Sequence, residues 1–146
     1  MHPTLLIGFG NALRGDDGVG ARLAERLEGE GLGEGVCVVA AQQLLPEHVE
    51  LLAAASRVVF VDAAVDVPPG DLVVGPLAPA DAAAVTFHHL TPAVLLAACA
   101  WLHGRAPEAT MVRIGAACTD TGMALSPLLA SRFDAYSERV RALLSP

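Results

Sequence analysis

Short apolar runs alternate along the chain with segments whose apolar residues recur at helical spacing. The clearest run is Val58-Val59-Phe60-Val61, which is typical of a strand buried on both faces of a sheet. Apolar runs predict strands at residues 4–8, 36–41, 57–61 and 111–114, and an edge strand at 71–74.

Four helices are expected between or after these strands. In residues 17–27, Val19, Leu23 and Leu27 fall on one helical face, and residues 46–55 form a second helix. The other two helices begin with an N-cap residue followed by proline, because proline suits the first helical position. Thr91-Pro92 predicts a helix at 91–102, and Ser126-Pro127 predicts a last helix that continues to residue 144.

This alternation predicts a three-layer α/β fold, in which a mainly parallel, twisted sheet carries helices on both faces. We expect residues 1–146 to form one domain, since this length is ordinary for a domain with its own core. Open sheets of this kind bind ligands beyond the carboxyl ends of their strands. The loops at that edge are therefore where functional residues are expected.

Composition narrows the classes of partner. The formal net charge is −7 and no stripe of Lys or Arg is present, so neither nucleic acid nor an anionic membrane is an expected partner. The apolar run at 92–102 is too short to cross a bilayer, and the first residues lack the pattern of a signal peptide, so we expect a cytoplasmic protein. Cys37, Cys99 and Cys118 form no CxxC pair and are predicted to be small buried residues.

The loop after the first predicted strand is rich in glycine and carries two adjacent carboxylates, Asp16 and Asp17. Its glycines suggest a dinucleotide-binding fingerprint, but Leu13 stands at the third glycine position and the second strand ends without an acidic residue. Asp16 and Asp17 can cap the helix that follows. A helix needs only one such cap. A functional role is therefore as well supported as a capping role for Asp16, and it is better supported than capping for Asp17.

Polar residues also stand after the third predicted strand and before the third predicted helix. Asp62 directly follows the buried run at 58–61, and His88 and His89 precede Thr91. Each has an ordinary alternative role, since an Asp can cap a turn and a His is often structural. Together, Asp17, Asp62 and a histidine would suit a divalent ion such as zinc or nickel. No HExxH or GxSxG motif and no recognisable cysteine nucleophile is present.

Three motifs resemble those of one enzyme family. The first runs from Ile7 to Gly20 and resembles the N-terminal signature of the hydrogenase maturation endopeptidases, roughly G-x-G-N-x-L-x-x-D-[DE]-x-x-G. The second is an Asp that ends a hydrophobic strand, here Asp62, and the third is a His followed two places on by Leu, here His88 with Leu90. The resemblance extends over nearly the whole chain.

The resemblance implies a function that the residues alone do not. Enzymes of this family remove a C-terminal extension from the large-subunit precursor of [NiFe] hydrogenases after nickel insertion. It implies that Asp17, Asp62 and His88 are metal ligands that sense nickel supplied by the precursor, with His89 as the alternative to His88 and zinc or another divalent ion as the alternative to nickel.

A mechanism follows from this resemblance as a hypothesis. The precursor docks with its nickel near Asp17, Asp62 and His88, and water attacks the scissile bond. Asp16 acts either as a base or by orienting Asp17 and the glycine-rich loop. The irregular segment 66–87 is the predicted docking surface. Two other functions stay open, because one α/β scaffold serves many functions: a non-catalytic metal-binding hydrogenase assembly factor and a nucleotide-binding protein.

Overall fold

The computed structural model describes residues 3–81, 83, 85–86, 88–122 and 124–145. They form a five-stranded sheet with the strand order β2-β1-β3-β5-β4. Strands β1, β2, β3 and β5 run parallel, and β4 pairs antiparallel with β5 at one edge. The strands are β1 (Thr4–Phe9), β2 (Val36–Ala41), β3 (Arg57–Ala64), β4 (Leu72–Pro76) and β5 (Glu108–Gly115). The predicted mainly parallel sheet is confirmed, including its edge strand.

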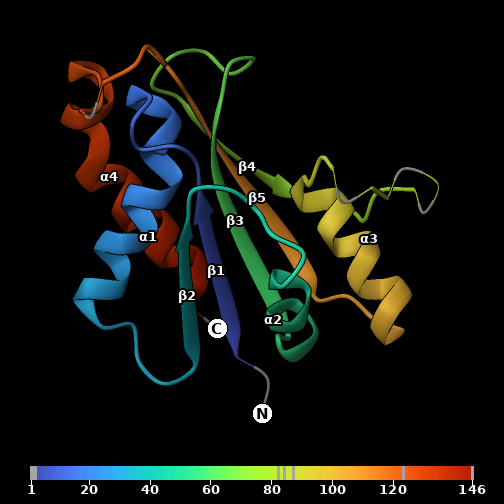
Figure 1. The fold of residues 1–146 in the computed structure, drawn as a ribbon. Helices are drawn as coiled ribbons and strands as arrows, with labels where there is room; N and C mark the ends of the chain where they lie inside the picture. The colour runs from blue at the N-terminus through green and yellow to red at the C-terminus, as the bar shows by residue number, and fades with distance from the viewer. Residues whose placement is uncertain (1–2, 82, 84, 87, 123, 146) are drawn as a thin grey trace.

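Helices cover both faces of this sheet, as the three-layer prediction requires (Figure 1). Helices α1 and α4 lie on one face, and α2 and α3 lie on the other, on the right in this view. The bounds are η1 (Gly15–Gly18, a 3-10 helix), α1 (Val19–Glu30), α2 (His48–Ala54), α3 (Pro92–His103) and α4 (Pro127–Leu144). No helix in the described part of the chain is long and apolar enough to span a membrane.

Alternation along the central strand divides the core into two clusters. Val58 and Phe60 pack with residues of α2 and α3, whereas Val59 and Val61 pack with residues of α1 and α4. This follows from the period of two in a strand, which sends successive side chains to opposite faces. Continuing the alternation, Asp62 lies on the α3 face of the sheet, at the end where the strand leaves the core.

Helix starts test the sequence prediction at single-residue level. The side chains of Thr91 and Ser126 each accept a hydrogen bond from the first turn of the following helix, and Pro92 and Pro127 begin α3 and α4 as predicted. The first helix instead begins two residues later than expected, after the 3-10 turn η1. The second begins at His48 rather than residue 46, because His48 Nδ1 accepts a hydrogen bond from the Leu45 N–H and holds a turn there.

Contact between α1 and the sheet depends on glycines on both sides, Gly8 in β1 and Gly20 in α1. A Cβ atom added to Gly20 would lie 2.2 Å from the carbonyl oxygen of Val61. This is far below a van der Waals contact, so only glycine permits the helix to lie this near β3. The close approach also brings the loop that precedes α1 beside the carboxyl end of β3.

The cysteines differ in their surroundings. Cys99 is buried and Cys37 is partly buried, but Cys118 is exposed, so the prediction that all three are buried is wrong for Cys118. It lies in an irregular segment after β5 that reaches the surface, which the composition of the segment does not reveal.

Candidate functional site

Asp17 lies in the loop between β1 and α1, at the carboxyl edge of the sheet, which is the upper end in Figure 1. Its Oδ2 atom accepts a hydrogen bond from the N–H of Asn11 at 2.8 Å. This bond spans the glycine-rich loop and fixes the direction of the carboxylate. Asp17 is half-buried, so its carboxylate keeps access to solvent.

Asp62 occupies the neighbouring strand and is partly buried. The pKa of its carboxyl group is raised from 3.8 to about 7. Burial is the largest cause and the negative charge of Asp17 adds to it, whereas a hydrogen bond from the Ala63 N–H and the positive charge of Arg113 lower the pKa. The turn η1, which carries Asp17, lies against β3, which carries Asp62, so the charge of Asp17 acts on Asp62. A carboxyl group with such a perturbed pKa, placed beside a second carboxylate at a ligand-binding edge, marks a candidate functional site.

Asp16 has a different environment although it precedes Asp17 directly. Its side chain is 0% exposed, and its two oxygens accept hydrogen bonds from three backbone N–H groups. Burial raises its pKa, but the hydrogen bonds from Ser126, Ala117 and Cys118 outweigh burial, and the net pKa is lowered. Of the two roles considered for Asp16, this geometry favours orientation over proton transfer, because the carboxylate is enclosed and its acceptors are engaged.

His88 and His89 are both exposed, in the segment that leads into α3. The N–H of His88 donates to the Thr86 hydroxyl at 3.3 Å. Among the described residues, no group of three or more His, Cys, Asp or Glu is arranged to hold a metal ion. The described residues therefore do not bring Asp17, Asp62 and His88 together as the predicted set of metal ligands. The predicted docking surface, 66–87, includes residues 82, 84 and 87, which lie outside the described residues.

Arg113 is a member of the site that the sequence did not reveal. It is the register partner of Asp62 across β3 and β5, so the two side chains lie on the same face of the sheet. Its guanidinium group also forms an ion pair with Asp66, just beyond β3. The alternation of β5 gives the face on which Arg113 lies, but only the register places it beside Asp62.

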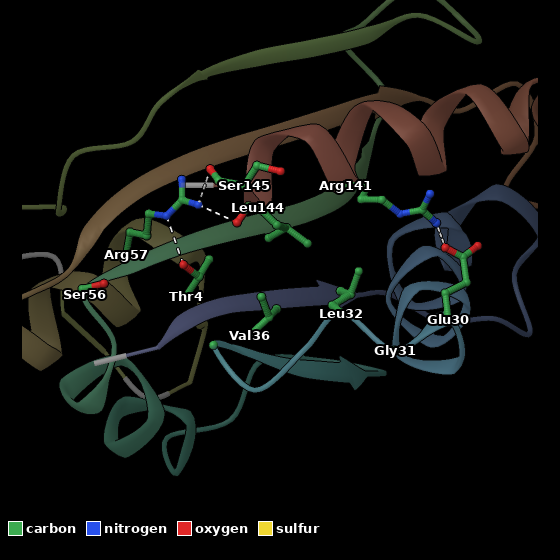
Figure 2. A pocket seen from close by; sticks show the side chains of 11 residues that line it. Thr4, Glu30, Gly31, Leu32, Val36, Ser56, Arg57, Arg141, Leu144 and Ser145 are labelled. Atoms are coloured by element: carbon green, nitrogen blue, oxygen red, sulfur yellow. Dashed lines mark hydrogen bonds and ion pairs between the residues drawn. The ribbon is translucent and has the colours of Figure 1, made fainter. Parts of the chain in front are cut away.

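A cavity of about 850 Å³ lies at the opposite, amino edge of the sheet (Figure 2). Two arginines border it, and both are engaged by other groups. Arg57 donates hydrogen bonds to the Thr4 hydroxyl and to the carbonyls of residues 143–145, and Arg141 pairs with Glu30. Arg57 thus caps the C-terminal end of α4, and this cavity is remote from the carboxylate pair.

Several solved structures resemble the whole fold. A [NiFe] hydrogenase maturation protease, HycI, from Thermococcus kodakarensis superposes with a TM-score of 0.79 at 23% identity, covering 97% of this chain and 92% of that one. The hydrogenase maturating endopeptidase HybD from E. coli gives a TM-score of 0.75 at 23% identity, over 97% of this chain and 91% of that one. A hydrogenase 2 maturation peptidase from a Thaumarchaeota archaeon gives 0.71 at 22%, over 98% of both chains.

The chain has the fold of the hydrogenase maturation proteases. No protein-family model matches the sequence, and no curated protein matches it. The match in fold extends over almost the full length of both chains.

On this maturation-protease fold, the space beside the glycine-rich loop is small. A cavity lined by residues of the loop and the end of β2, including Asn11, Leu13 and Gln42, has a volume of about 190 Å³. Typical ligand pockets are roughly 300–1,000 Å³. A nucleotide over this loop is therefore disfavoured, in agreement with the incomplete fingerprint in the sequence.

Proposed function

We propose that the protein is an endopeptidase that removes the C-terminal extension of a [NiFe] hydrogenase large-subunit precursor after nickel insertion. The observation that carries this proposal is the pair Asp17 and Asp62 at the carboxyl edge of a maturation-protease fold. The structural neighbours are proteases of hydrogenase maturation. The resemblance of three sequence motifs to that family supports the assignment of Asp17 and Asp62 to the site.

Nickel enters this proposal as part of the substrate. Asp17 and Asp62 fit a divalent cation, because two carboxylates that repel each other are both stabilised by a positive charge between them. Imidazole and carboxylate oxygen together suit nickel or zinc. His88 would complete the set from the segment before α3, which requires that docking of the precursor brings His88 to the carboxylates.

The chain's own residues would act by holding and orienting the precursor. Asp17, fixed by the Asn11 N–H, and Asp62, fixed in β3, define where the metal centre of the precursor lies. A bound nickel ion supplies Lewis acidity for attack by water on the adjacent peptide bond. A precursor without nickel leaves Asp17 and Asp62 uncompensated, so its docking is weaker and cleavage does not follow.

The test compares nickel-loaded and nickel-free precursor mixed with the purified protein, and follows precursor mass. We expect a C-terminal fragment to be lost only from the loaded form. The variants Asp62→Asn and His88→Ala should abolish cleavage while remaining folded, and His89→Ala is the matched control that should retain it. Full cleavage of the loaded precursor by both Asp62→Asn and His88→Ala would reject the assignment of Asp62 and His88 to the site.

The same experiment separates this function from that of a non-catalytic metal-binding assembly factor. An assembly factor would bind metal or form a complex with the precursor and leave its mass unchanged. If the protein forms a stable complex with the large-subunit precursors of its own organism and removes a fragment from none of them, the assembly-factor function is favoured over the endopeptidase.

A further inference from the structure

In the segment between β5 and α4, residues 116–126, the described residues 116–122 and 124–126 are mostly exposed and have almost no regular structure. Segments of this kind usually move freely, because few backbone hydrogen bonds hold them. Here the segment is held at both ends by one buried carboxylate. The Oδ2 atom of Asp16 accepts from the N–H groups of Ala117 at 2.8 Å and Cys118 at 3.0 Å, and Oδ1 accepts from the Ser126 N–H at 2.7 Å.

Backbone hydrogen bonds add to this attachment. The N–H of Asp16 donates to the carbonyl of Cys118, the N–H of Gly15 donates to the carbonyl of Gly122, and the N–H of Gly122 donates to the carbonyl of Leu13. Gly15 has a φ of 56°, and a Cβ atom there would lie 2.8 Å from the Cys118 carbonyl oxygen. The glycine-rich loop and the 116–126 segment are therefore joined as one unit.

This unit lies beside the carboxylate pair. The N–H of Ala116 donates to the carbonyl of Ala64, two residues beyond Asp62 in β3. At its other side, the segment is bound to Asp16, the neighbour of Asp17. The segment therefore adjoins the strand that carries Asp62 and the loop that carries Asp17, at the edge of the sheet from which a substrate would reach both carboxylates.

We propose that residues 117–122, 124 and 125 form a wall of the docking site for the folded precursor, and that Asp16 is the positioning residue that holds this wall in place. The inference rests on the proposed function and names the surface that recognises the substrate. A buried carboxylate with a full set of donors is a rigid support for the exposed backbone above it. Docking of a folded partner gains from such rigidity, because less freedom is lost on binding.

Cys118 offers a direct test, because it is the exposed cysteine on this wall, while Cys99 is buried and Cys37 is partly buried. Alkylation of Cys118 with N-ethylmaleimide, checked by peptide mass, places a bulky group on the wall without changing Asp17 or Asp62. We expect KM for the nickel-loaded precursor to rise by about fivefold or more while kcat changes by less than about twofold. The Cys118→Ser variant treated in the same way is the control and should be unaffected.

The second variant is Asp16→Asn, whose amide nitrogen would face an N–H donor and cannot accept a hydrogen bond. It should raise KM for the loaded precursor and speed hydrogen exchange at the amides of Ala117 and Cys118. Arg57→Met is the matched control, because it removes hydrogen bonds at the opposite edge of the sheet and should leave KM unchanged.

The outcomes distinguish the two proposals. If KM is unchanged both after alkylation of Cys118 and in Asp16→Asn, and the unmodified protein cleaves the precursor, the docking-wall proposal is wrong and the proposed endopeptidase function stands. If the unmodified protein cleaves no loaded precursor, the proposed function fails and the wall fails with it.

Discussion

The raised pKa of Asp62 makes a quantitative prediction about stability. Its pKa rises from 3.8 in the unfolded chain to about 7 in the folded protein. The folded state therefore binds this proton more tightly, so the contribution to stability is complete below about pH 4 and is lost as pH rises to about 7. A shift of about 3 units at about 1.36 kcal/mol each gives roughly 4 kcal/mol, and partial access to water reduces this to about 2–4 kcal/mol.

The variant Asp62→Asn removes the charge and keeps the shape. We expect its free energy of unfolding to match that of the wild type near pH 4 and to exceed it by about 2–4 kcal/mol at pH 8. Urea denaturation at several pH values between these limits measures the difference, with a chelator present because a bound cation would stabilise the ionised group.

Asp66→Asn is the control for this series. Asp66 pairs with the same Arg113, but its side chain is 69% exposed, so removal of its charge should cost at most about 1 kcal/mol at any pH in the range. A constant difference between Asp62→Asn and the wild type from pH 4 to 8, or a less stable variant at pH 8, would refute the reasoning that burial and Asp17 penalise the charge of Asp62.

Three further predictions concern packing, capping and substrate. Gly20→Ala should fail to fold or lose more than about 3 kcal/mol of unfolding free energy in thermal melts, because its Cβ would meet the Val61 carbonyl. In the same measurement, Gly29→Ala on the exposed side of α1 should gain about 0.5–1 kcal/mol. Arg57→Met should lose about 1–3 kcal/mol in urea denaturation, since it uncaps α4, and an unchanged midpoint would show that these hydrogen bonds contribute nothing net. A free peptide with the sequence of the precursor's C-terminal extension should stay intact in the mass assay, because docking requires the folded precursor; its efficient cleavage would contradict the docking model.

Most of the fold could be predicted from the sequence, because the relevant signals are local. The run at 58–61 and the Thr91-Pro92 pair each determine structure within a few residues of themselves. The late start of α1 could not be predicted in this way. It depends on hydrogen bonds from Gly15 and Asp16 to a segment about a hundred residues further along the chain.

For the candidate site, too, some features follow from local sequence signals and others depend on distant parts of the chain. The position of Asp17 and Asp62 at one edge follows from parallel strands, and in the structure the turn that carries Asp17 lies against the strand that carries Asp62. The register that sets Arg113 beside Asp62 is a property of the sheet, and no pattern within β5 contains it. The assignment of His88 as a metal ligand stays a prediction, because it depends on where the segment before α3 lies when the precursor is bound.

Three carboxylates near one edge of the sheet differ in how far the fold compensates their charges. Asp16 is fully buried, yet its pKa is lowered because three backbone N–H groups surround its charge. Asp62 is more exposed, yet its pKa is raised because Asp17 adds to the cost of burial and the compensating groups are too few. A group whose charge is already compensated has little to gain from a ligand, whereas an uncompensated pair gains most from a cation. The fold thus stabilises the charge of Asp16 by its own backbone, and this contrast is why the proposed function assigns the cation of the precursor to Asp17 and Asp62.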